Sequence, residues 1–187
     1  MKIKSNASPS EFSSPFYKAN EDFCSVFESY IASHSGMVKG EYNAWSYLIF
    51  GKFESSKQWR LMYKKSSLTS GNLFLPDDQG LLTMATWTTK LPYNKDLICT
   101  IRKRKTLDFI WLPFNKNLIK LNQSNNYVLK SNTSLTKEIN IIINILKPLF
   151  EIENIYEIHL KNNELTIDLR SKLHHFDFLD EIIKQVP

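Results

Sequence analysis

The sequence predicts an α+β fold in which an antiparallel sheet is packed by an N-terminal helix, a long apolar helix near 134–148 and a C-terminal helix. Strand-forming residues alternate with period two between Gly80 and Leu112. Apolar stripes with helical spacing lie on both sides of that stretch. The order of elements is one helix, several strands, a helix, two strands and a helix. It lacks the regular alternation of strand and helix that a parallel sheet needs.

The chain has 187 residues, a length typical of one domain, and its composition of 42% hydrophobic and 23% charged residues is that of a globular protein. Residues 1–17 are rich in Ser, Asn and Pro and are predicted to form a flexible arm before a single domain at 18–187. No apolar run follows the first lysines, and the most apolar segment, Ile139 to Leu146, is too short to span a membrane. We therefore expect a cytoplasmic protein.

The first helix is predicted at about 20–34. Asn20 is the expected N-cap and Gly36 the expected stop. The stripe that predicts the helix consists of Phe23, Val26, Phe27, Tyr30 and Ile31.

Several strands are expected to follow. The first covers 41–53 with a bend at Gly51, the second covers 59–64, and a short third covers 72–75. The central strands are predicted at about 81–88, 96–102 and 107–112. The last two are expected to form a hairpin that reverses at Arg102–Lys105.

Residues 113–132 are expected to be irregular, with weak strand-like pieces at 118–121 and 127–130. A helix then follows, capped by Thr133 or Ser134 and ended near Lys147 by Pro148. Its wide stripe consists of Leu135, Ile139, Ile142, Ile143, Leu146 and Leu149.

A hairpin and a helix are predicted to close the chain. The strands at 155–160 and 165–170 are expected to join through a tight turn at Asn162 and Asn163, because Asn tolerates positive φ. The final helix is predicted at 177–186 with Asp177 as its cap.

This order of elements is similar to that of uncharacterised α+β domains of bacterial proteins. Those domains also have an N-terminal helix, an antiparallel strand set, a long apolar helix, a hairpin and a closing helix. In some of them a membrane segment precedes the domain, and this sequence contains none. Because those domains have no assigned activity, the resemblance implies no function and no site residue.

Positive charge is concentrated in the middle of the chain, where residues 51–120 hold 13 Lys/Arg and 5 Asp/Glu. The cluster Arg102, Lys103, Arg104 and Lys105, with Arg60 and the 57–65 segment, is a candidate site for phosphates or another anionic surface. The alternative reading is a solvated hairpin whose charges discourage aggregation.

Four tryptophans form the second candidate. Trp45, Trp59, Trp87 and Trp111 are each predicted in a strand, where core packing is their expected role. The alternative is a small-molecule pocket that they line between the sheet and the helices. Cys24 and Cys99 lack metal-ligand spacing and are expected to be buried thiols.

The sequence contains no GxSxG, GxGxxG, P-loop or HExxH signature. His174 and His175 with Asp177 could hold zinc, but adjacent histidines point in different directions, so we predict no metal and no cofactor. The leading interpretation is a non-enzymatic protein-interaction module of a cytoplasmic bacterial protein. The alternatives are a module that binds a small apolar ligand and a weak binder of nucleic acid or anionic surfaces. The oligomeric state is left open.

Overall fold

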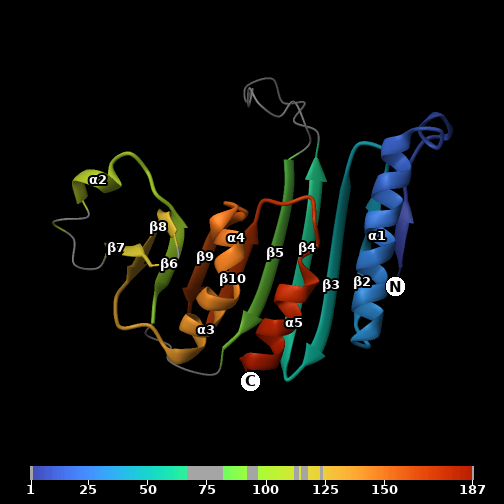
Figure 1. The fold of residues 1–187 in the computed structure, drawn as a ribbon. Coiled ribbons are helices and arrows are strands. Elements are labelled where there is room, and N and C mark those ends of the chain that lie inside the picture. Colours follow the sequence, from blue (N-terminus) through green and yellow to red (C-terminus); the bar gives the residue numbers. More distant parts are fainter. Residues whose placement is uncertain are drawn as a thin grey trace. The chain divides into compact units, whose positions relative to one another are not determined.

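In the computed structural model the chain forms two compact units. The structure describes residues 2–66, 82–91, 97–111, 114, 118–122 and 124–186. The first unit contains residues 1–87 and 170–174, and the second contains 88–169 and 175–187. Helices and mostly antiparallel strands make up the chain, which confirms the α+β class (Figure 1). The boundary between an arm and a single domain stays a prediction.

The strands of the first unit follow the order β1-β2-β3-β4-β5. β1 runs parallel to β2, whereas β2 with β3 and β3 with β4 are antiparallel. β5 continues along the chain into the second unit. The strands are β1 (Ile3–Ser5), β2 (Met37–Tyr42), β3 (Tyr47–Ser55), β4 (Lys57–Ser66) and β5 (Leu82–Lys90).

The predicted single strand at 41–53 was wrong, because the chain turns at Asn43–Ser46 between β2 and β3. The bend expected at Gly51 was also wrong. Gly51 lies in regular register opposite Val38 and Leu61. A Cβ there would lie 2.5 Å from Cδ1 of Ile31, so the glycine permits the close approach of a helix to β3.

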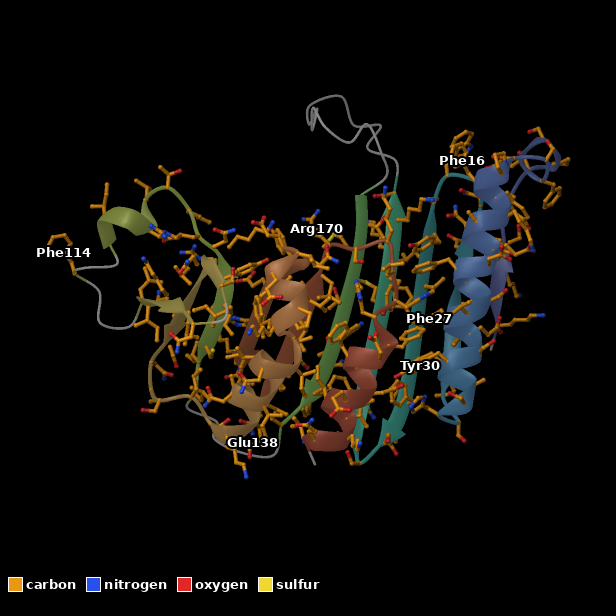
Figure 2. All side chains as sticks on the ribbon, viewed as in Figure 1. Phe16, Phe27, Tyr30, Phe114, Glu138 and Arg170 are labelled. Atoms are coloured by element: carbon orange, nitrogen blue, oxygen red, sulfur yellow. The ribbon has the colours of Figure 1, made fainter. Side chains whose placement is uncertain are left out.

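That helix is α1 (Pro15–Ser33), which packs on β2 and β3. It begins earlier than predicted, because Ser14 accepts a hydrogen bond from the Phe16 amide and Pro15 occupies the first helical position. Figure 2 shows Phe27 and Tyr30 pointing from α1 toward the strands. The buried residues of α1 recur at intervals of three and four and are Tyr17, Asn20, Cys24, Phe27 and Ile31.

Two details of the predicted first helix were wrong. Val26 belongs to the exposed face of α1, because the buried stripe passes through Cys24 and Phe27 instead. Asn20 is not the cap, since it lies in the second turn and its side chain is buried. A short 3-10 helix, η1 (Pro9–Glu11), precedes α1.

The strands of the second unit follow the order β10-β9-β6-β8-β7, and the registers between these neighbours are antiparallel. The predicted alternation at 96–102 is confirmed, because Leu97, Cys99 and Ile101 are buried. The strands are β6 (Cys99–Lys103), β7 (Leu118–Leu121), β8 (Ser124–Ser131), β9 (Ile155–Lys161) and β10 (Glu164–Leu169).

The β9–β10 hairpin has the turn, and its second strand has the inward-facing residues, that the sequence predicts. Asn162 and Asn163 have φ of 52° and 64°, the left-handed values expected of the turn. The inward residues of β10, namely Leu165, Ile167 and Leu169, are fully buried.

The strand predicted at 107–112 was wrong. Its residues contain the short helix α2 (Asp108–Trp111), and β6 pairs with β8 and β9 instead. The chain between 113 and 132, predicted irregular, contributes β7 and β8, so the two weak strand signals there are confirmed. The strand predicted at 72–75 lies outside the described residues.

Three further helices belong to the second unit: α3 (Lys137–Ile145), α4 (Lys147–Glu151) and α5 (Phe176–Gln185). Thr136 caps α3, not the predicted Thr133 or Ser134, because its side chain accepts from the Ile139 amide. Pro148 lies in the first turn of α4, where it needs no amide donor. Asp177 does not cap α5, since His175 precedes that helix with φ of 57°.

α3 contacts α5, and α4 contacts β8. Phe150 of α4 packs edge-on against Tyr127 of β8 with ring centroids 4.9 Å apart. None of the helices in the described residues is both long and apolar enough to cross a bilayer.

We expect Ile142→Asp to prevent folding of the second unit. Ile142 is fully buried in α3, and an unpaired carboxylate at such a position costs several kcal/mol. Circular dichroism and amide exchange measure the effect. Asn144→Asp, on the exposed side of the same helix, is the control and should fold normally. A folded, protected Ile142→Asp protein would contradict the packing of α3.

Candidate binding surfaces

The basic cluster of the second unit is largely engaged in contacts within the chain. Arg102 of β6 pairs with Asp108 of α2 through two hydrogen bonds, from Nη1 at 2.7 Å and from Nη2 at 2.9 Å. The Lys105 amide donates to the same carboxylate at 2.6 Å. Asp108 is buried. The Arg102 guanidinium lowers the pKa of Asp108 to about 2, so the ion pair persists at neutral pH.

Lys103 is also paired, with Glu153 at 2.8 Å. Arg104 is half-buried, and its amide donates to the Asn126 carbonyl oxygen. The Lys105 side chain is exposed. Arg102 and Lys103 are therefore matched by carboxylates.

Arg60 and the 57–65 segment belong to the first unit, on β4. Arg60 is exposed, whereas Lys65 is half-buried and donates to Oδ1 of Asn20 at 2.7 Å. Burial lowers the pKa of Lys65. The predicted anion-binding residues thus come from two different units.

The tryptophans differ in exposure and in unit. Trp59 and Trp87 are 1% and 0% exposed in the first unit, which agrees with core packing. Trp45 is 52% exposed. It was predicted in a strand but lies on the β2–β3 turn. Trp111 belongs to α2 in the second unit rather than to a strand. Trp45, Trp59 and Trp87 do not line the cavities found among the described residues.

A chain of hydrogen bonds ties two of the buried aromatic groups to the backbone of the first unit. The Trp87 indole N–H donates to the Tyr63 hydroxyl at 2.9 Å, and that hydroxyl donates to the His174 carbonyl oxygen at 2.6 Å. The His174 ring stacks on Phe23 with centroids 3.7 Å apart. These contacts hold residues 170–174 in the first unit.

Burial shifts the pKa of one histidine and of both cysteines. Burial lowers the pKa of His175 and raises the pKa of both the Cys24 and Cys99 thiols to about 12. The two thiols are free, buried and protonated at neutral pH, as expected of small core residues. Within the described ranges, no three His, Cys, Asp or Glu residues are placed to hold a metal ion.

Three large aromatic side chains are exposed on the first unit, and we call Phe12, Phe16 and Trp45 the aromatic surface. They are 53%, 51% and 52% exposed. The Phe16 and Trp45 rings lie 5.9 Å apart at 38°, and Phe12 meets the edge of Tyr17 at 5.1 Å. Figure 2 shows Phe16 at the N-terminal end of α1. Only Trp45 among the three was a predicted site residue, because single exposed aromatics leave no periodic signal.

The turn that presents Trp45 is fixed by buried hydrogen bonds. The Asn20 carboxamide donates to the carbonyl oxygens of Asn43 at 2.7 Å and Ala44 at 3.1 Å. The Asn43 carboxamide oxygen accepts from the Trp45 amide at 2.9 Å. Glu11 of η1 accepts from the Ala44 amide at 3.3 Å. The turn is therefore held to η1 and α1 at once.

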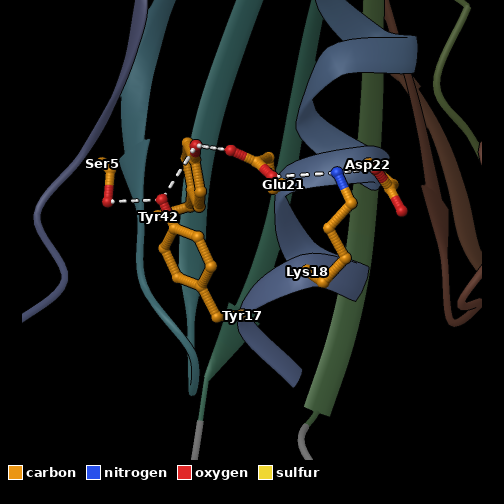
Figure 3. Close-up of polar contacts among 6 residues, drawn as sticks. All are labelled: Ser5, Tyr17, Lys18, Glu21, Asp22 and Tyr42. Carbon is orange, nitrogen blue, oxygen red and sulfur yellow. Dashed lines mark hydrogen bonds and ion pairs between the residues drawn. The ribbon is translucent and has the colours of Figure 1, made fainter. Parts of the chain in front are cut away.

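A second polar network connects β1, α1 and β2 (Figure 3). The Tyr17 hydroxyl donates to Ser5 Oγ at 3.1 Å and lies 3.4 Å from the Tyr42 hydroxyl. The Tyr42 hydroxyl donates to Glu21 at 3.3 Å, and Lys18 pairs with the same carboxylate at 3.0 Å. Burial raises the pKa of Tyr42, which stays protonated as a donor. The network positions β1 beside the aromatic surface.

A shallow groove lies between β7, β8 and α3 in the second unit. It consists of two adjoining hollows of about 290 and 270 Å³. Both are lined by Ile119, Leu129 and Leu135, with carboxamides and hydroxyls at the rim. Each is slightly smaller than the usual lower limit for a ligand pocket, roughly 300 Å³. No predicted site residue lines this groove.

No protein-family model matches this chain, and no curated protein is similar to it.

We expect Asn20→Ala to lower the free energy of unfolding by about 2–3 kcal/mol, because two buried carbonyl oxygens and the Lys65 ammonium lose their partner. Urea unfolding followed by tryptophan fluorescence measures the change. Lys18→Ala, on the exposed face of α1, is the matched control and should cost less than about 1 kcal/mol. Equal losses in both variants would contradict the role of Asn20.

We expect the Arg102–Asp108 pair to stabilise the second unit at neutral pH and to fail in acid. The folded-state pKa of Asp108 is about 2, below its ordinary 3.8, so its contribution is present above about pH 4 and is lost as pH falls toward 2. Asp108→Asn should lower the free energy of unfolding by about 2 kcal/mol at pH 7 and remove that acid-dependent loss. Denaturant unfolding between pH 2 and 7 measures both effects.

The control for this pair is Glu153→Gln, which breaks the exposed bridge to Lys103. Exposed pairs contribute less than about 1 kcal/mol. An Asp108→Asn protein as stable as the parent at pH 7 would show that the pair does not stabilise the unit.

Proposed function

We propose that the chain is a non-enzymatic protein-interaction module and that the aromatic surface of the first unit is its main contact. The observation that supports this most directly is the contact between the half-exposed rings of Phe16 and Trp45, together with the half-exposed Phe12 in the segment before α1. Aromatic side chains are enriched at protein interfaces and at the residues that dominate binding energy.

The aromatic surface exposes apolar area that a partner could bury. Complete burial of such a side chain contributes roughly 1.5–3 kcal/mol, so the exposed halves of three rings offer about 2–4 kcal/mol. The turn at Asn43–Ser46 is already fixed by Asn20 and Glu11. A partner therefore has to order little of this surface, which lowers the entropic cost of binding.

The chemistry of the titratable groups supports a binding role over a catalytic one. The Cys24 and Cys99 thiols are held protonated by burial, and burial also favours the neutral form of His175. The polar networks at Asn20 and Tyr42 consist of groups that satisfy one another. Such groups position the backbone.

A small-molecule role has one observation in its favour, the groove between β7, β8 and α3. Its apolar floor of Ile119, Leu129 and Leu135 suits a small apolar ligand. We rank this second because the groove is open and near the lower size limit.

The test uses a doubly substituted protein, Phe16→Ala with Trp45→Ala. We expect the parent chain, used as bait, to enrich a specific partner, and the purified partner to bind the double variant at least tenfold more weakly. Isothermal titration with the purified partner measures the change. Val26→Ala, an exposed apolar position on α1, is the control and should bind like the parent.

Two results would overturn the proposal. One is a partner whose affinity is the same for the double variant and for the parent. The other is loss of binding in the Val26→Ala control to the same extent, which would mean that the affinity does not depend on the aromatic surface.

A further inference from the structure

The second unit has an apolar apex of its own, distinct from the aromatic surface. Leu107, Ile110 and Phe114 lie on the extension between β6 and β7 that contains α2, and we call these three the α2 tip. They are 64%, 59% and 79% exposed. Figure 1 shows the extension with α2 leaving the strands, and Figure 2 shows Phe114 projecting from it.

A charged contact holds the base of this extension. Asp108 is the buried group at its base, and it is fixed by the Arg102 guanidinium and by the Lys105 amide. The neighbouring Leu107 and Ile110 are exposed beside this contact, and Phe114 is exposed further along the chain. Burial of such large apolar side chains against a partner would be favourable.

The base of the tip is positively charged. Residues 102–111 contain four Lys/Arg and one Asp. Arg102 and Lys103 are matched by Asp108 and Glu153, whereas the side chains of Lys105 before the tip and Lys120 after it are exposed. Exposed apolar residues flanked in sequence by exposed lysines are the pattern of a segment that enters the interface of a bilayer with negative headgroups.

From this combination we infer that the α2 tip docks the protein on an anionic lipid surface, with Leu107, Ile110 and Phe114 in the headgroup–acyl boundary and Lys105 and Lys120 against the headgroups. This inference is independent of the aromatic surface and of its proposed partner. A nucleic acid fits less well, because a phosphate backbone offers nothing to Leu107 and Ile110. The tip is convex and local, so the contact is peripheral.

The test is co-sedimentation of the full chain with vesicles. One set contains phosphatidylcholine only. The other contains phosphatidylcholine with about 30% phosphatidylserine, which gives the vesicles a strong negative surface potential. We expect binding to the phosphatidylserine vesicles to be at least tenfold tighter than to the neutral ones. Binding should weaken several-fold between about 0.1 and 0.5 M salt, where charges are screened.

Matched variants separate insertion from simple charge attraction. Leu107→Ser with Ile110→Ser should weaken binding at least fivefold, while Ile98→Ser with Ile152→Ser, exposed apolar positions elsewhere in the second unit, should leave it unchanged. Circular dichroism and thermal unfolding of both double variants confirm that they are folded. Lys105→Glu should weaken binding to anionic vesicles only.

Several outcomes would overturn the inference. They are no binding to anionic vesicles, equal binding to neutral ones, or equal losses in the two double variants. Binding of a single-stranded oligonucleotide that depends on Lys105 but not on Leu107 or Ile110 would assign the charges to nucleic acid instead. A protein partner lost only in the tip variant, without vesicle binding, would assign the tip to a protein interface.

Discussion

Buried polar groups need hydrogen-bond partners, and this requirement fixes the local path of the chain in both units of this protein. In the first unit Asn20, buried in α1, satisfies two carbonyl oxygens of the β2–β3 turn and accepts from Lys65. In the second unit buried Asp108 binds Arg102 and the Lys105 amide. A buried polar group without a partner costs about 1–3 kcal/mol, so each contact fixes the local path of the chain.

Both proposed surfaces follow from these two contacts. The Asn20 contacts hold the turn that presents Trp45 beside Phe16, and the Asp108 contacts hold the extension that exposes Leu107. In each case polar bonds anchor a segment whose apolar side chains are then unnecessary for the core. The protein can therefore keep exposed apolar residues in fixed positions, as a binding module requires.

Much of the fold could be read from periodicity, because burial on one face repeats with the geometry of the element. The buried residues of β10 and the paired Asn of its turn are examples. Of the candidate sites, sequence identified Trp45 and the Arg102–Lys105 cluster. It missed Phe16 as a neighbour of Trp45 and Phe12 as a neighbour of Tyr17, since these contacts form only when residues distant in sequence come together.

The sequence by itself determined the α+β class, the β9–β10 hairpin and the presence of helices at both ends, because local propensity and periodic burial act over short distances. Only the tertiary structure decided that residues 108–111 form α2, that the 41–53 segment contains a turn, and that Arg102 and Lys103 are paired with carboxylates. Those outcomes depend on Asp108, Asn20 and Glu153, each of which lies apart in sequence from at least one group that it binds. A polar contact between side chains leaves no periodic pattern in the sequence, and the Arg102–Asp108 contact accompanies a helix where local propensity favours a strand.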